Sequence, residues 1–205
     1  MRASPFPNPG NPEKKLRARS WVHADDWPRI FLSELLIGEL SDWAQEILTG
    51  VTAQIPADPE PGPASFWSGR LWEPVTHEVY LALRAESEYA AWLVALGLRP
   101  NHFTVHVNAL DSFRGLGSLL DFVAEQGFAL NESGGRIKGS VEVGLEQGST
   151  MADRIEVEFA DGAFEIPTCY YEFALRHPVG AGLYDGFVAA SADRIFESTH
   201  AQGTT

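Results

Sequence analysis

The sequence is short of cysteine, basic residues and long apolar runs, and each shortage excludes a class of protein. A single cysteine, Cys169, cannot form a disulfide within the chain. There are 15 Lys and Arg against 28 Asp and Glu, and the net charge of -13 argues against a surface that binds nucleic-acid phosphates. No stretch approaches the roughly 18 apolar residues of a membrane span. The first residues also lack the apolar core of a signal peptide, so we expect a cytoplasmic protein with no membrane partner.

What is present is an ordinary globular composition, with 44% hydrophobic and 21% charged residues in 205. Prolines at positions 5, 7, 9 and 12 predict an irregular lead-in over residues 1–14. Residues 15–75 hold strand candidates at 16–23 and 29–35, then a helix that Ser41 would cap and that ends near Gly50. A proline-rich connection over residues 53–74 marks a possible boundary.

Residues 76–199 have the order of a βαβββ module. A helix over 87–96 precedes a strand at 102–108, an amphipathic helix at 116–125 and strand candidates at 141–147, 153–159 and 163–173. The pair Asp161-Gly162 predicts a hairpin between the last two candidates. The sequence therefore indicates an α+β fold with a mixed sheet, and residues 200–205 form a tail.

The strand at 102–108 has one polar and one apolar face, because side chains two apart on a strand point the same way. The face expected to pack against the core carries Phe103, Val105 and Val107, and the other carries His102, Thr104 and His106. A histidine on such a face is more often structural than a ligand, but it is a reasonable metal ligand if it faces a cavity.

Glu172 is the second candidate ligand. It lies between Tyr171 and Phe173 in a segment apolar enough to be buried, and a buried carboxylate needs a cation, a metal ion or a proton. Arg176, four residues on and on the same strand face, is an alternative ion-pair partner. If the two strands lie side by side, His102 and Glu172 would form two legs of a two-histidine, one-carboxylate iron site, which leaves positions open for substrate and dioxygen.

Segments spread over residues 14–199 resemble the 2-oxoadipate dioxygenase/decarboxylase family. They are 28–36 (PRIFLSELL), 86–92 (ESEYAAW), 101–104 (NHFT), 127–131 (GFALN), 147–150 (QGST), 171–174 (YEFA) and 191–199 (SADRIFEST). The resemblance implies a vicinal-oxygen-chelate-like fold, in which paired βαβββ modules form a cupped sheet around a metal. It also implies a non-haem Fe(II) enzyme that converts 2-oxoadipate and O2 to 2-hydroxyglutarate and CO2 in lysine degradation.

The resemblance assigns roles to particular residues. His102 matches the second metal histidine of the family, which also contacts substrate, and Glu172 matches its metal glutamate. The substrate loop matches Ala190 and Ser191. Three further residues fall on matching positions and are candidates for substrate binding or support, namely Gln147, Ser149 and Arg176.

The family's first iron histidine and its substrate arginine lie upstream of the segment that matches residues 14–18, so we expect the first module to be incomplete in this sequence. Three readings follow. The sequence belongs to a longer enzyme, or it is a short form whose site is completed by water, His77 or a partner chain, or it is a non-catalytic domain that binds a small dicarboxylate or acts as a scaffold. An incomplete sheet would expose an apolar edge, so either a homodimer or poor solubility is expected.

Other basic residues and histidines near the site have simpler interpretations. His106 shares a face with His102, but strand geometry separates side chains four apart by roughly 13 Å, too far for one ion. Arg136 and Lys138 lie near Gly139, and we expect them in a solvated turn.

Overall fold

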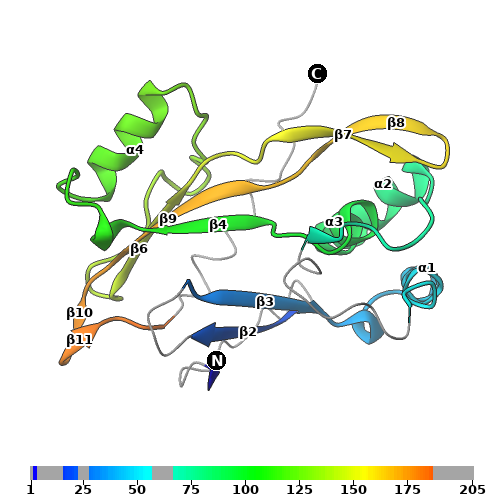
Figure 1. The fold of residues 1–205 in the computed structure, drawn as a ribbon, viewed down its shortest axis with the longest axis horizontal. Helices are drawn as coiled ribbons and strands as arrows, with labels where there is room; N and C mark the ends of the chain where they lie inside the picture. Colours follow the sequence, from blue (N-terminus) through cyan, green and yellow to red (C-terminus); the bar gives the residue numbers. More distant parts are fainter. Residues whose placement is uncertain (1, 4–15, 23–27, 57–66, 187–205) are drawn as a thin grey trace. The chain divides into compact units, whose positions relative to one another are not determined.

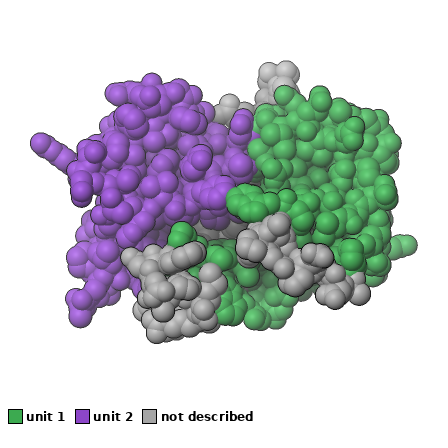
Figure 2. All heavy atoms as spheres, viewed as in Figure 1, with its two compact units in different colours: residues 1–100, 154–168 green, residues 101–153, 169–205 purple. Residues whose placement is uncertain are grey.

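The computed structural model describes residues 2–3, 16–22, 28–56 and 67–186, and it divides the chain into two compact units (Figures 1 and 2). Unit 1 takes residues 1–100 and 154–168, and unit 2 takes residues 101–153 and 169–205. This division differs from the expected boundary at residues 75 and 76. In the described residues, no helix combines the length and the apolar character that crossing a membrane requires.

Unit 1 combines a small antiparallel sheet, of order β1-β2-β3, with a helical core. Its elements are β1 Arg2–Ala3, β2 Leu16–Val22, β3 Ile30–Leu35, η1 Ile37–Glu39, α1 Asp42–Thr52, α2 His77–Glu86, α3 Glu88–Leu96, β7 Arg154–Phe159 and β8 Gly162–Pro167. The predicted strands β2 and β3 are confirmed. The lead-in is not wholly irregular, since Arg2 and Ala3 pair with Val22 and Trp21 of β2.

Side-chain caps begin each of the three α-helices that the structure describes in unit 1. The hydroxyl oxygens of Ser41, Thr76 and Ser87 accept hydrogen bonds from backbone amides three residues on, which would otherwise lack a partner. The cap predicted at Ser41 is confirmed, although α1 ends at Thr52 rather than near Gly50. Helix α2 was not predicted. It packs with α1, α3 and the β7–β8 hairpin around one core, which is why these segments form a single unit across the expected boundary.

The β7–β8 hairpin is confirmed, with its turn at Ala160 and Asp161 and with Gly162 opening β8 at φ 144°. The single strand predicted over 163–173 is wrong. It is two strands, because Pro167 has no amide to continue the ladder and the backbone breaks at Thr168 and Cys169. The carbonyl of Thr168 instead accepts a hydrogen bond from the Trp92 indole, 3.1 Å away.

Unit 2 contains a βαβββ module with a mixed sheet, as predicted. Its elements are β4 His102–His106, η3 Val107–Ala109, α4 Leu116–Glu125, β5 Lys138–Ser140, β6 Leu145–Ser149, β9 Tyr170–Arg176, β10 Pro178–Val179 and β11 Gly182–Leu183. The order is β4-β9-β6-β5, with β4 and β9 parallel and the other pairs antiparallel. The candidate at 153–159 belongs to the hairpin of unit 1 and not to this sheet, and the candidate at 141–147 becomes a turn followed by β6.

Helix α4 covers one face of the unit 2 sheet. Its leucines pack with Val105 of β4 and with Phe173 and Leu175 of β9. The helix approaches closely at Gly148, where a Cβ atom would lie 2.8 Å from Cδ1 of Leu120. The prediction for β4 holds at Val105 and Val107 but is wrong at Phe103, which is 44% exposed and contacts the Tyr171 ring. The opposite face carries the polar residues, among them His102 and Glu172.

Candidate metal and substrate site

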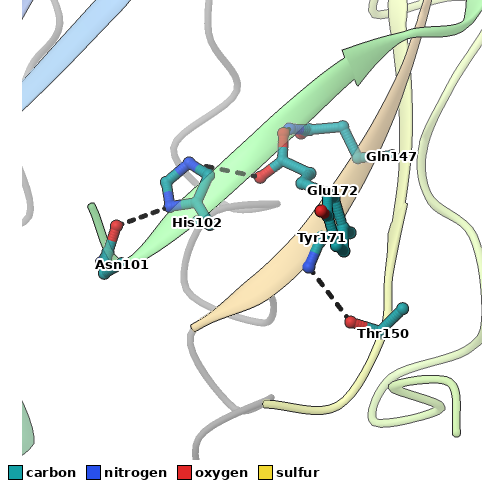
Figure 3. A network of polar contacts seen from close by, with 6 residues as sticks. All are labelled: Asn101, His102, Gln147, Thr150, Tyr171 and Glu172. Atoms are coloured by element: carbon teal, nitrogen blue, oxygen red, sulfur yellow. Dashed lines mark hydrogen bonds and ion pairs between the residues drawn. The ribbon is translucent and has the colours of Figure 1, made fainter. Parts of the chain in front are cut away.

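His102 and Glu172 lie on adjacent strands, which meets the condition set by the sequence analysis for a shared site. In the parallel pair of β4 and β9, Thr104 is opposite Glu172, and His102 is opposite Tyr170. The two side chains therefore lie on the same face of the sheet, with His102 two residues before the position opposite Glu172. The Nε2 atom of His102 is 4.0 Å from Oε2 of Glu172 (Figure 3).

Neighbouring groups fix the orientation of the His102 ring. Its Nδ1 atom is 2.8 Å from the side-chain oxygen of Asn101, which accepts a hydrogen bond from Nδ1–H. The ring also stacks on the buried Tyr170 ring, with centroids 5.2 Å apart. Because the proton is held at Nδ1, the lone pair of Nε2 faces Glu172 and is available to a metal ion.

The Glu172 carboxylate is buried, with 5% of the residue exposed. Its Oε1 atom accepts a 2.7 Å hydrogen bond from the amide of Gln147 on β6, which leaves Oε2 directed at His102 (Figure 3). The alternative ion pair with Arg176 is not formed. The Arg176 guanidinium donates instead to the carbonyls of Tyr184 and Gly186, at 2.7 and 3.0 Å.

The facing pair has the chemistry of two metal ligands, one imidazole nitrogen and one carboxylate oxygen. Bonds from such atoms to a divalent transition metal are about 2.0–2.2 Å long, so two neighbouring ligand atoms on one ion lie about 3 Å apart. The 4.0 Å gap would therefore close by about 1 Å when an ion binds both atoms. Among the described residues, no cluster of three or more His, Cys, Asp or Glu side chains could hold a metal ion. His102 and Glu172 fit two of the three ligands of a two-histidine, one-carboxylate metal site.

Neither His77 nor His106 lies in such a cluster within the described residues, so neither supplies a third ligand there. His77 is the first residue of α2 in unit 1, and its ring stacks on Phe164 with centroids 3.9 Å apart. His106 is exposed at the far end of β4 from His102. The predicted substrate residues Ala190 and Ser191 lie outside the described residues.

The polar face continues onto β6 and β5 with residues that are unusually well buried. Ser149 is opposite Glu172, and Lys138 is opposite Gln147. The exposed fractions of Lys138, Gln147 and Ser149 are 4%, 2% and 1%. The prediction of a solvated turn at Lys138 is therefore wrong, because β5 pairs with β6 and buries the lysine side chain.

The sequence gives no sign that Lys138 is buried, but it does indicate burial of Gln147 and Ser149. Gln147 and Ser149 are two residues apart, so they share one face of the sheet. Gly148 lies on the other face, against helix α4. A run of polar, glycine and polar residues inside an otherwise buried strand is costly unless the polar groups have a ligand or a partner. Lys138 had no comparable signal, since a basic residue beside glycines usually marks a turn.

The comparisons with known proteins identify the family. The family model of 2-oxoadipate dioxygenase/decarboxylase matches residues 64–185. A chloroplastic 2-oxoadipate dioxygenase/decarboxylase of Arabidopsis thaliana is 37% identical over 187 residues, with 84% of this chain and 50% of the relative covered. The chain belongs to the 2-oxoadipate dioxygenase/decarboxylase family, and it spans about half the length of that curated relative.

Two solved structures share the fold. A candidate hydrolase from Shewanella frigidimarina NCIMB 400 is 47% identical with a TM-score of 0.84, covering 88% of this chain and 71% of that one. The hydroxyglutarate synthase of Oryza sativa, in complex with 2-oxoadipate, is 32% identical with a TM-score of 0.83, covering 98% of this chain and 71% of that one. With the βαβββ module of unit 2, these likenesses confirm the expected fold class.

Proposed function

We propose that this chain carries part or all of an Fe(II)-dependent 2-oxoadipate dioxygenase/decarboxylase, which converts 2-oxoadipate and O2 to 2-hydroxyglutarate and CO2 in lysine degradation. The observation that carries the proposal is the facing pair of His102 Nε2 and Glu172 Oε2, 4.0 Å apart on a polar sheet face. The names of the relatives support it, because the rice protein was solved with 2-oxoadipate and the Arabidopsis protein is a 2-oxoadipate dioxygenase/decarboxylase.

His102 and Glu172 would hold the metal, and their neighbours would hold them in position. Bound Fe(II) supplies open positions for the 2-oxo acid and O2 and the redox chemistry of oxidative decarboxylation. The Asn101 contact keeps His102 in the tautomer whose Nε2 can bind. The Gln147 amide occupies one oxygen of Glu172, so the carboxylate would bind through Oε2 alone. Burial of Glu172 raises the cost of an uncompensated charge, which favours a bound cation.

Arg176 is assigned a supporting role in substrate binding. Its guanidinium holds the carbonyls of Tyr184 and Gly186, a few residues before Ala190 and Ser191, the residues that we propose contact the substrate. By fixing that end of the segment, Arg176 would set where the substrate loop begins. The cytoplasmic location and the homodimer stay predictions from the sequence.

The test is anaerobic Fe(II) binding by calorimetry, followed by oxygen uptake with 2-oxoadipate. His102→Ala and Glu172→Ala should each abolish stoichiometric binding, while His106→Ala, on the same strand face but exposed, should bind as the wild type does. Binding that survives loss of Glu172 would refute the site. A wild-type chain that binds 2-oxoadipate but no Fe(II) would favour the alternative of a non-catalytic dicarboxylate-binding domain.

A further inference from the structure

One phenol ring packs directly against the metal pair. Tyr170 is opposite His102 in the parallel ladder of β4 and β9, and the two rings stack with centroids 5.2 Å apart and planes 14° apart. Tyr170 is also two residues before Glu172 on β9, so its side chain lies on the same face of the sheet as that carboxylate. The ring therefore contacts one metal ligand and is the next side chain on the strand face from the other.

Asn101 holds the two stacked rings together. Its side-chain oxygen accepts from Nδ1–H of His102, and its backbone carbonyl accepts a 3.2 Å hydrogen bond from the amide of Tyr170. Tyr170 is only 3% exposed, so oxidants dissolved in bulk solvent have little access to its ring. An oxidant that reaches this ring is therefore more readily made at the metal site than taken from solvent.

The next residue along the chain has the opposite environment. Tyr171 lies on the other face of the sheet, because successive side chains on a strand alternate, and it is 50% exposed. Its ring contacts Phe103 on that face, with centroids 6.2 Å apart. The two phenols are adjacent in sequence, yet Tyr170 faces an oxidant made at the metal site and Tyr171 faces oxidants dissolved in water.

We propose that Tyr170 is a site of self-hydroxylation, an inference that rests on the proposed function. A phenol ring is electron-rich, so this ring can accept an oxygen atom that fails to reach the substrate. In the step, a 2-oxo acid loses CO2 and takes up one atom of O2, which gives the carboxylic acid one carbon shorter. The other oxygen atom inserts into the ring C–H bond beside the phenol oxygen of Tyr170, and the hydrogen stays on the new hydroxyl.

The step balances without a further reductant. The 2-oxo acid and the ring each lose two electrons, and O2 accepts four. With 2-oxoadipate the products are glutarate, CO2 and a catechol side chain at Tyr170, in place of 2-hydroxyglutarate. Self-hydroxylation therefore competes with hydroxylation of the substrate. It should increase with 3,3-difluoro-2-oxoadipate, in which fluorine replaces both hydrogens on the carbon beside the keto group.

The test is mass spectrometry of the tryptic peptide over residues 155–176, which contains both tyrosines. The wild-type chain is loaded with Fe(II) anaerobically and exposed to isotopically heavy O2 with either 2-oxo acid. Tyr170 should gain the mass of one heavy oxygen atom, in higher yield with the difluoro analogue, and Tyr171 should gain none. Fragment ions separate the two tyrosines from each other and from Cys169. Glu172→Ala, with folding checked by circular dichroism, should leave Tyr170 unmodified because a metal ligand is lost.

Fe(II) binding, O2 uptake and 2-hydroxyglutarate are measured in the same samples. A wild type that consumes O2 and keeps Tyr170 unmodified overturns the modification site and leaves the proposed function standing. Equal label on Tyr170 and Tyr171, or label that persists in Glu172→Ala, would also overturn it, because both results indicate dissolved oxidants. Labelled Tyr170 without 2-hydroxyglutarate supports the modification site and refutes the proposed reaction. A wild type that binds no Fe(II) refutes both.

Discussion

Nε2 of His102 and Oε2 of Glu172 face each other at 4.0 Å because β4 and β9, the first and last strands of the module in chain order, are parallel neighbours. In a sheet of order β4-β9-β6-β5 the chain must leave β4, form α4 and two antiparallel strands, and return beside its starting strand. The topology therefore joins residues that are far apart in sequence. Each of the two has its own supporting contact, and these contacts can be tested separately.

Asn101→Ala should weaken Fe(II) binding about 10- to 100-fold, because the His102 ring would lose the acceptor that fixes its tautomer and orientation. The measurement is the Fe(II) dissociation constant under anaerobic conditions. Asn101→Asp is the matched control, since it keeps an acceptor for Nδ1–H and should bind nearly as well as the wild type. Equal binding by the Ala and Asp variants would show that the contact does not position His102.

Gln147→Leu should also weaken Fe(II) binding, by a similar factor, because Oε1 of the buried Glu172 would lose its donor and the carboxylate could rotate. Gln147→Glu should be worse, since it places a second carboxylate against Glu172. The same titration, with circular dichroism to check folding, measures both variants. A Gln147→Glu variant that binds Fe(II) more tightly than Gln147→Leu would contradict the supporting role and would mark residue 147 as a ligand position.

The alternation of polar and apolar residues predicts which face of a strand a side chain occupies, and only part of this site follows from that. Alternation in β4 was enough to place His102 on the polar face of its strand, but the pairing of the His102 and Glu172 strands was only a condition of the predicted site, which the structure meets. Alternation failed at Phe103, because facing away from the polar face of the sheet does not guarantee cover by the helix, and α4 packs further along at Val105 and Val107. The burial of Lys138 depends on a short strand pairing, which three residues cannot signal.

The error at 163–173 has a different cause. Polar and apolar residues alternate from β8 into β9, so alternation alone predicts one continuous strand. Pro167 nevertheless ends the β8 ladder, and the carbonyl of Thr168 accepts a hydrogen bond from the Trp92 indole. The two halves of that segment belong to different units. Only long-range contacts, which no local pattern contains, decide that the hairpin packs on the helices of unit 1 rather than extending the sheet of unit 2.

Gly97→Ala should destabilise the protein by about 3 kcal/mol or more, through backbone strain and a steric clash. Gly97 ends α3 at φ 71°, and an added Cβ would clash with the Gly69 carbonyl oxygen, in the bridge that pairs Gly69 with Leu98. Gly117→Ala is the matched control. Gly117 lies inside α4 with nothing within 4 Å of the new Cβ, so this change should stabilise the protein by about 0.5–1 kcal/mol. Urea unfolding measures both, and equal effects would contradict the prediction.

The Tyr89 hydroxyl should make stability fall at high pH. Burial raises the pKa of Tyr89 to about 12, and the hydrogen bond to the Ser33 carbonyl, which acts in the opposite direction, does not cancel this effect. The unfolded chain loses the proton near its ordinary pKa of about 10, whereas the folded chain keeps it to about 12. The stabilisation is therefore complete below pH 10 and is lost as the pH rises to 12, and it amounts to about 2–3 kcal/mol.

Urea unfolding from pH 8 to 12 tests this dependence on the wild type and on Tyr89→Phe, which has no proton to lose. The variant should be less stable near pH 8 by about 1 kcal/mol, because the Ser33 carbonyl loses its donor. Between pH 10 and 12 the wild type should lose about 2–3 kcal/mol relative to the variant, so the order of stability should reverse. Tyr171→Phe, which removes an exposed hydroxyl, serves as the control and should follow the wild-type curve. Parallel curves for the wild type and Tyr89→Phe would mean that another group governs the alkaline limit of the fold.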